Sequence, residues 1–349
     1  MDIVRIGIVG CGGIARAHLT AYRAIPGVEV AAVYDVSPTA CESFAREAGA
    51  IAATSLAAMA DMRLDAVSIC TPPGARIDCC RPFLSAGIAV LCEKPLAVDG
   101  AAARELATLA AASTSLFMTA FCHRFHGPVL ELKKLIDSGT LGQPVLVRMV
   151  FAGRFELQGN HRCDPKLAGG GCIMDNGTHA VDLFRFLVGD IGEIQAMTAT
   201  AVQDAAVEDV GTIGLRSTSG VLAEIATSFS APSGANWIEW FASAGTARVS
   251  YWNAGHPDLA YCLAGTDAWV PIDCSAYPSR FEGQLRHFIA CVRSGSRPSP
   301  TVDDGLAASL AIAGAYASAR SGERIGLGAA LPTPARISPQ ARGSAGIQR

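Results

Sequence analysis

Residues 3 to 15 read IVRIGIVGCGGIA, a short apolar, β-branched run that leads directly into a glycine-rich turn. Gly10, Gly12 and Ala15 fit the pattern G-x-G-x-x-G/A. In that pattern the first glycine permits a tight turn, the second lets the backbone approach a pyrophosphate, and the third small residue lets a helix pack closely on the strand. The stretch therefore predicts a strand, a phosphate-binding turn and a helix.

The sequence on either side of the turn supports this interpretation. The turn opens a helical pattern, so the first N–H groups of a helix, at Gly13 and Ile14, would face the phosphates of a nucleotide. The next strand-like run, residues 28–35, ends in Asp35, about 20 residues after the turn, where an acidic residue accepts hydrogen bonds from an adenosine ribose. Asp35 would also repel a 2′-phosphate and no arginine follows it, so we expect NAD, with NADP as the alternative cofactor. A plain turn residue is the other interpretation of Asp35.

Strand-like and helical segments alternate through the first 120 or so residues. Apolar strands separated by helical crossovers predict a parallel sheet that is covered on both faces. Thr71 and Pro72 follow the strand at 64–70, and Glu93 and Lys94 follow the apolar part of the next strand. Because ligands bind at the carboxyl ends of such strands, we expect these four residues to lie at the cofactor.

The second half of the chain has a different pattern. After Gly142 the apolar residues recur at every second position, in runs bounded by glycine, serine and aspartate. This period is typical of strands in an antiparallel sheet. The runs are PVLVRMVF (144–151), EIQAMTATAV (193–202), VGTIGLRS (210–217), GVLAEIATSF (220–229) and WIEWFAS (237–243).

Composition excludes several classes of function. Of the 349 residues 50% are hydrophobic and only 17% charged, which predicts a well-buried globular protein. The net charge of −3 offers no basic surface for nucleic acid, and no uncharged apolar run is long enough for a membrane helix. The N-terminus lacks the pattern of a signal peptide, and the 12 cysteines form no CxxC pair. We therefore expect a cytoplasmic protein whose cysteines are buried thiols.

Residues 169 to 183, GGGCIMDNGTHAVDL, place a glycine triplet before Asp175 and His179. A carboxylate and an imidazole four residues apart share one face of a helix, and histidine can exchange a proton near neutral pH. Taken alone, the stretch favours a loop followed by an ordinary amphipathic helix with Asp175 near its N-terminus. A metal site that uses Asp175, His179 and either His161 or Cys172 is a further reading, but no zinc-binding pattern supports it and we expect none.

In order, the GxGxxA turn, Asp35, TPP (71–73), EKP (93–95) and the stretch around His179 closely resemble the Gfo/Idh/MocA family, which includes glucose–fructose oxidoreductase and inositol dehydrogenase. The likeness extends from residue 3 to about residue 328. It implies a Rossmann domain at 1–122 and an α+β domain at 123–328 with an open, mostly antiparallel sheet. In the family this sheet commonly packs against another subunit, so we expect a homodimer or homotetramer. Residues 329–349 extend past the likeness and are expected to form a flexible tail.

The resemblance also implies a catalytic set. Lys94, Asp175 and His179 match the family's catalytic residues, with His179 as the acid/base and the other two polarising and positioning the substrate. Arg124, His161 and Arg162 are expected to contact the substrate. We interpret the glycine triplet as a close approach of backbone to ligand. A histidine is common in the family a few residues after TPP, whereas this chain has GARIDCC, beginning at Gly74.

The implied activity is an NAD-dependent dehydrogenase or reductase that acts on a ring carbinol carbon of a sugar or cyclitol. Two alternatives stay open. One is an NADP-dependent reductase of a ketosugar. The other is a regulatory protein that keeps the nucleotide-binding fold without turnover.

Overall fold

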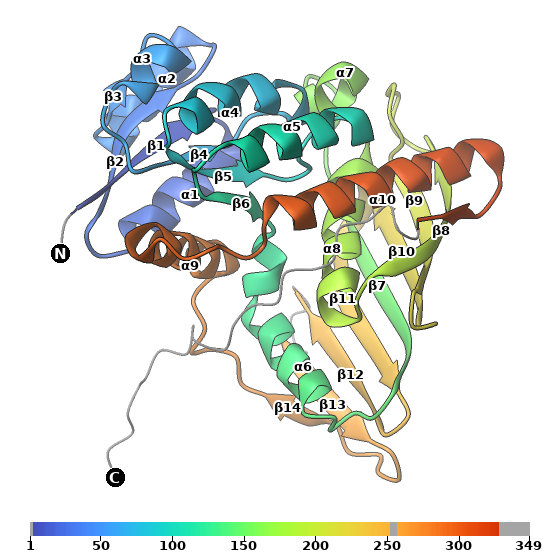
Figure 1. Cartoon of the computed structure of the whole chain (residues 1–349). Helices are drawn as coiled ribbons and strands as arrows, with labels where there is room; N and C mark the ends of the chain where they lie inside the picture. The colour runs from blue at the N-terminus through green and yellow to red at the C-terminus, as the bar shows by residue number, and fades with distance from the viewer. Residues whose placement is uncertain (1–2, 252–256, 328–349) are drawn as a thin grey trace, which may run out of the picture.

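A six-stranded parallel sheet with helices on both faces forms the N-terminal part of the molecule (Figure 1). The computed structural model describes residues 3–251 and 257–327. The strand order β3-β2-β1-β4-β5-β6 is that of a dinucleotide-binding fold and confirms the predicted Rossmann domain. The strands are β1 (Val4–Val9), β2 (Val28–Tyr34), β3 (Ile51–Ala52), β4 (Ala66–Ile69), β5 (Ala89–Glu93) and β6 (Phe117–Ala120). The helices between them are α1 (Gly13–Arg23), α2 (Pro38–Ala48), α3 (Leu56–Ala60), α4 (Arg76–Ser85) and α5 (Gly100–Ala112).

The strand order reverses between β1 and β4. Ligands of open α/β sheets bind at such a switch point, outside the carboxyl ends of the strands. Every residue of β4, β5 and β6 is buried, which is why these strands appear in the sequence as continuous apolar runs. The fold therefore sets the ends of β1, β4 and β5 side by side at one edge.

A nine-stranded, mostly antiparallel sheet dominates the second part, in the order β14-β13-β12-β11-β7-β10-β9-β8-β15. The exception to antiparallel pairing is β10, which runs parallel to β7. The sheet confirms the predicted fold class. Its strands are β7 (Pro144–Arg154), β8 (Ile191–Ala199), β9 (Val210–Ser217), β10 (Leu222–Ser228), β11 (Ser230–Ala242), β12 (Gly245–Ser250), β13 (Leu259–Leu263), β14 (Val270–Ile272) and β15 (Ile325–Gly326).

Helices cover one face of this sheet. The apolar face of β7, with Val147, Met149 and Phe151, belongs to the same core cluster as buried residues of α8 (Thr178–Leu187). Burial alternates along β9, as expected for a sheet with one face packed and one exposed. The segment between β6 and β7 contains the short turn η2 (Cys122–Phe125) and α6 (Gly127–Asp137), and the predicted domain boundary after residue 122 falls within η2.

Two C-terminal helices join the halves. Helix α9 (Arg280–Ser294) packs against α1 and η2, and α10 (Val302–Ser321) lies along both α5 and β8 (Figure 1). Thr119 at the end of β6 donates a hydrogen bond to the carbonyl of Thr301, at the start of α10. The last part of the chain therefore fixes one sheet against the other.

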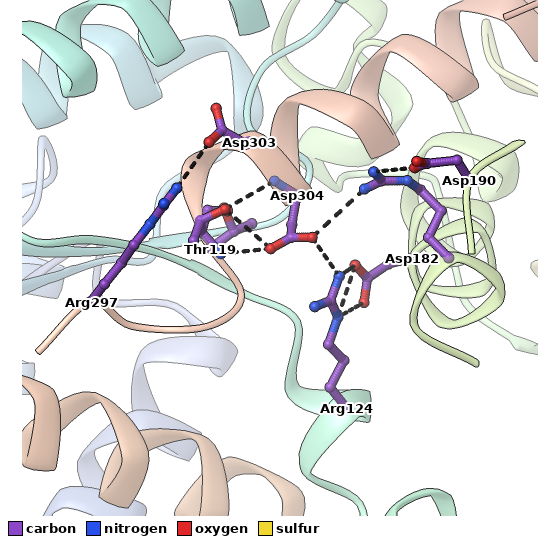
Figure 2. A network of polar contacts seen from close by, with 9 residues as sticks. Thr119, Arg124, Asp182, Asp190, Arg297, Asp303 and Asp304 are labelled. Atoms are coloured by element: carbon purple, nitrogen blue, oxygen red, sulfur yellow. Dashed lines mark hydrogen bonds and ion pairs between the residues drawn. The ribbon is translucent and has the colours of Figure 1, made fainter. Parts of the chain in front are cut away.

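A buried ion network lies at this junction (Figure 2). The Arg124 guanidinium contacts both carboxylate oxygens of Asp182 on α8, at 2.6–3.1 Å, and Asp304 of α10 at 3.1 Å. All three side chains are at most 1% exposed. Asp304 also closes a capping box with Thr301 at the start of α10. One arginine thus links η2, α8 and α10.

All 12 cysteines lie within the described ranges as free thiols, and most are buried, as predicted. Over the same ranges, no helix has the length and apolar character needed to cross a membrane. The tail predicted at 329–349 lies outside the described residues.

Candidate active site

The glycine-rich turn after β1 is shaped to receive a ligand. Gly10 has φ +89, and a Cβ there would lie 2.9 Å from the backbone of Cys70, so glycine is required. A Cβ on Gly12 or Gly13 would meet no atom within 4 Å in the described structure, so the space over the turn is open. Gly12 caps α1 without a side-chain hydrogen bond, which leaves the first N–H groups of α1, including that of Ile14, to a ligand.

Asp35 is held rigidly at the end of β2. Its carboxylate accepts hydrogen bonds from the backbone N–H groups of Cys11 (2.8 Å) and Ser37 (2.9 Å). These bonds fix a negative charge beside the turn and leave further lone pairs on the same oxygens. The open turn, the free helix start and this carboxylate together fit an adenosine dinucleotide.

The turns after β4 and β5 are tied together by Arg76. Its guanidinium donates to the carbonyl of Thr71 (3.1 Å) and to the carbonyl of Pro95, and the side chain is buried. Arg76 lies in the segment where the resemblance suggested a histidine. It links the TPP turn, with Pro72, to the EKP turn and so sets one edge of the site.

Glu93 lies beneath the site instead of at its surface. Its carboxylate is buried between the imidazole of His18 (3.1 Å) and the backbone N–H of Lys94 (3.2 Å). His18 in turn contacts the hydroxyl of Ser68 at 3.2 Å. Glu93 therefore supports the backbone of Lys94, and its contact with the cofactor stays a prediction.

Lys94 and Asp175 meet across the two domains. The Lys94 ammonium pairs with the Asp175 carboxylate and donates to the main-chain carbonyl of Asp175 at 3.1 Å. Arg162 donates from Nε to the second carboxylate oxygen at 3.0 Å. Burial alone would raise the pKa of Asp175, but Lys94 and Arg162 together hold it well below its usual range. Asp175 is therefore an anion with both oxygens engaged.

His179 lies at the start of α8, beside this ion pair. Its side chain is 9% exposed, and its Nδ1 has no hydrogen-bond partner among the described residues. Burial, followed by the charges of Lys94 and Arg280, lowers the pKa of His179 well below its usual value. The imidazole is thus neutral at pH 7 and able to accept a proton.

Asp175 lies within a π-helical turn (Ile173–Gly177, labelled η4) that leads directly into α8. The four-residue spacing predicted that Asp175 and His179 share one face of an α-helix. The structure differs, because the backbone around Asp175 forms this wider turn. Such turns are rare and are often found at functional sites.

His123 and Tyr251, which had no predicted role, also line this site. The rings of His123 and His179 are 4.3 Å apart, and His123 Nδ1 lies 3.1 Å from the Tyr251 hydroxyl. His123 could have been found by position, because it follows the carboxyl end of β6 at the same edge of the sheet. No local pattern marks Tyr251, which reaches the site only through the sheet.

Cys122, His123 and His179 could offer three ligand atoms within 4.8 Å of one another, so a metal was tested against their surroundings. Burial lowers the pKa of His123, and the positive charges of Arg280 and Lys94 add to the effect. The same charges act on His179. The nearby positive charges of Arg280 and Lys94 would oppose a cation bound by these two imidazoles.

The three residues predicted to contact the substrate lie in different places. Arg162, in the short turn η3 (His161–Cys163), reaches Asp175, and its guanidinium lies 4.7 Å from the ring centre of Phe155. His161 is exposed at the rim of the same turn. Arg124 does not reach the site, because its guanidinium is fully buried against Asp182 and Asp304 (Figure 2).

The interpretation of the glycine triplet was wrong. A Cβ on Gly169 would overlap the carbonyl of Val98, one on Gly170 would overlap the hydroxyl of Tyr316, and one on Gly171 would overlap the carbonyl of Glu208. The three glycines let backbone pack against other parts of the protein. Ligand approach is not what requires them.

The fold and these residues define a class: oxidoreductases that bind a nicotinamide dinucleotide on a Rossmann domain and a substrate on a second, sheet-based domain. Residues 4–121 match the model of the oxidoreductase family with an NAD-binding Rossmann fold, and residues 129–248 match the GFO/IDH/MocA C-terminal domain. The chain belongs to the Gfo/Idh/MocA family.

Individual relatives agree with this assignment. The chain is 29% identical to inositol 2-dehydrogenase of Rhizobium meliloti over 89% of this chain and 95% of that protein. It is 27% identical to D-apiose dehydrogenase of Paraburkholderia graminis over 92% and 88% of the two chains. The fold is also that of levoglucosan dehydrogenase, solved in complex with NADH and levoglucosan, with a TM-score of 0.86, 20% identity, and coverage of 95% of this chain and all of that one.

Proposed function

We propose that this chain is an NAD-dependent dehydrogenase or reductase that acts on a ring carbinol carbon of a sugar or cyclitol. The observation that carries the proposal is the Lys94–Asp175 ion pair beside a neutral His179, at the edge of the sheet where the nucleotide turn lies. The names of the relatives, an inositol dehydrogenase and an apiose dehydrogenase among them, support a polyol substrate.

The nucleotide would be held by the turn at Gly10, Gly12 and Gly13, by Asp35 and by the TPP turn. When bound, NAD supplies the acceptor or donor of the hydride. The fixed carboxylate of Asp35 favours free ribose hydroxyls, and a 2′-phosphate would lie against its negative charge. NAD is therefore proposed over NADP.

His179 moves the proton. In the oxidising direction its neutral imidazole takes the proton of the substrate hydroxyl while the carbon gives up its hydride, and in the reducing direction it returns that proton. The Lys94 ammonium stabilises the negative charge that develops on the same oxygen. Asp175 and Arg162 hold Lys94 in place, since the carboxylate contacts both cations.

The proposal is tested with the purified chain, NAD and a panel of sugars and cyclitols, including inositol, apiose and levoglucosan. We expect a substrate-dependent absorbance change at the nicotinamide band with at least one member, and quenching or enhancement of NADH fluorescence on binding. Tight NADH binding without turnover across the panel would contradict the enzyme and favour the nucleotide-binding regulator. Turnover only with NADPH and a ketosugar would favour the alternative reductase.

We further propose that the exposed face of the nine-stranded sheet associates two or four copies of the chain. Opposite the helices this face carries a row of charged side chains, with Arg148 paired to Glu224 and Glu239. A self-complementary row of this kind suits a symmetric contact. Light scattering at micromolar concentration will give the mass of a dimer or tetramer, and a monomer mass would contradict the proposal.

A further inference from the structure

A buried carboxylate outside the proposed catalytic set contacts the segment that leads to Asp175. Glu208, just before β9, is 8% exposed. It accepts hydrogen bonds from the backbone N–H groups of Gly171 (2.9 Å) and Ile173 (3.0 Å), one on each oxygen. Its own carbonyl accepts a third, from the N–H of Cys172 at 3.1 Å. One residue thus binds three consecutive amides.

These amides lie at the start of the helical segment formed by η4 and α8. Cys172, which precedes η4, makes no side-chain capping bond there. The first N–H groups of a helix lack partners within the helix, and a negative charge at that end is stabilising. Glu208 supplies both the hydrogen-bond acceptors and the negative charge, from a segment that is distant in the sequence. Hydrogen bonds to a carboxylate are also stronger than those between neutral groups.

A second contact holds Glu208 in turn. Tyr316 on α10 donates its hydroxyl to the Glu208 carboxylate at 2.7 Å. Burial and the neighbouring carboxylate raise the pKa of Tyr316 well above its usual value, so the hydroxyl keeps its proton. The same hydroxyl fills the space where Gly170 lacks a side chain. The loop before β9, α10 and the glycine triplet therefore form one packed unit.

This unit ends two residues before the catalytic carboxylate. The N–H of Asp175 donates to the carbonyl of Gly171 at 3.0 Å, so the backbone that Glu208 binds also carries the backbone of Asp175. We propose that Glu208, assisted by Tyr316, is a positioning residue that sets Asp175 against Lys94. The inference rests on the proposed function, because positioning has a catalytic consequence only if Lys94 and Asp175 act in the reaction.

The test compares Glu208→Gln with Tyr316→Phe. A glutamine side chain has only one acceptor oxygen. Its NH₂ group would therefore face a backbone N–H that now donates a hydrogen bond to the second carboxylate oxygen of Glu208. We expect Glu208→Gln to lower kcat by about 10- to 100-fold, because displacement by about 1 Å can cost that much. Tyr316→Phe keeps the carboxylate and should lower kcat only a few-fold. In both variants the Kd for NADH should stay within about twofold of the wild-type value, since the nucleotide turn is untouched.

The chain offers a matched control in the neighbouring Asp209. This carboxylate is fully buried and accepts hydrogen bonds from the backbone N–H groups of Ala201, Val202 and Gln203. The loop formed by these three residues carries no proposed catalytic residue. Asp209→Asn should therefore lower stability while its folded form keeps its kcat. If both buried-carboxylate variants lose kcat equally, the specific role of Glu208 is overturned.

A second readout does not depend on turnover. Amide hydrogen exchange at residues 171–175 should be at least about tenfold faster in Glu208→Gln and unchanged in Asp209→Asn. Unchanged exchange in Glu208→Gln, or faster exchange with unchanged kcat, would overturn the inference. If the wild-type chain turns over no substrate, the proposed function fails, and the exchange comparison alone decides whether Glu208 holds this segment. Tyr316→Phe provides the same comparison should Glu208→Gln not fold.

Discussion

At the scale of single residues, the site depends on how neighbours set the charge of each group. Asp175 is buried yet ionised, because two cations contact its oxygens. His179 is buried and neutral, because burial and the same positive surroundings disfavour its charged form. A fixed anion, a fixed cation and a neutral base within one site suit the proposed proton transfer at a carbinol oxygen.

The charge state of His179 makes a prediction about stability. A histidine whose pKa is lower in the folded than in the unfolded chain binds fewer protons when folded, so stability falls as the pH drops below the unfolded value of about 6.5. In His179→Gln this contribution is absent. The unfolding free energy of the variant should therefore depend less on pH between 7.5 and 5.5 than that of the wild type, by up to about 1.4 kcal/mol per pH unit.

Chemical denaturation at several pH values checks this prediction. His18 is no alternative source of the difference, since its pKa is raised to about 10, against the lowering effect of its burial, by Cys70 and Glu93. Parallel pH dependences for the variant and the wild type would show that His179 is not buried in its neutral form.

At the scale of elements, the junction of η2, α8 and α10 sets the position of His179 relative to the glycine-rich turn at Gly10. The Arg124 guanidinium fastens α8 three residues beyond His179, through Asp182, and fastens α10 through Asp304 (Figure 2). All three groups are buried, and a second buried cation, Arg185, lies 3.7 Å from Asp304, so removing Arg124 takes away the main but not the whole charge compensation of the two carboxylates.

Arg124→Met is expected to lower the unfolding free energy by about 3–5 kcal/mol, since buried Asp182 would lose its bidentate partner and Asp304 would keep only Arg185, at 3.7 Å. Arg297 is the matched control, because it forms an exposed pair with Asp303 at 3.1 Å in the same region (Figure 2). Arg297→Met should change stability by less than about 1 kcal/mol. Equal effects of the two substitutions in denaturant unfolding would contradict the assigned role of the network.

Elements with strong local patterns could be predicted, and those defined by contacts could not. The turn at Gly10 and the strand that ends in Asp35 follow from spacing and strand context, and both are found as expected. The short strands β14 and β15 have three and two residues, too few to show a period. The glycine triplet was visible in the sequence, but its reason was not, because Tyr316 and Glu208 lie far along the chain.

The residues of the site likewise divide into those that the sequence predicted and those that only the fold brings together. Lys94, Asp175 and Arg162 were predicted, and the structure brings them together. Arg124 was misplaced because adjacency to a strand end does not show which way a side chain turns. Glu208 and Tyr251 were missed because a carboxylate before a strand and a tyrosine after one are common, and only the fold brings them to this place.

At the scale of the whole molecule, the structure explains why one chain needs two sheets. The parallel sheet offers the nucleotide turn and Lys94, and the second sheet carries the segment with Asp175 and His179. Helices α9 and α10 hold the two parts together, so the proposed catalytic set is complete only when both parts are in place (Figure 1).

We propose above all that His179 transfers the proton in an NAD-dependent oxidation of a polyol. The most direct test is kcat of His179→Ala on the best substrate of the panel, with the Kd for NADH measured on the same preparation. We predict that kcat falls by about 10² to 10⁴ while the Kd for NADH is nearly unchanged, because the nucleotide turn lies on the other sheet. An unchanged kcat in a folded, NADH-binding variant would contradict this role of His179.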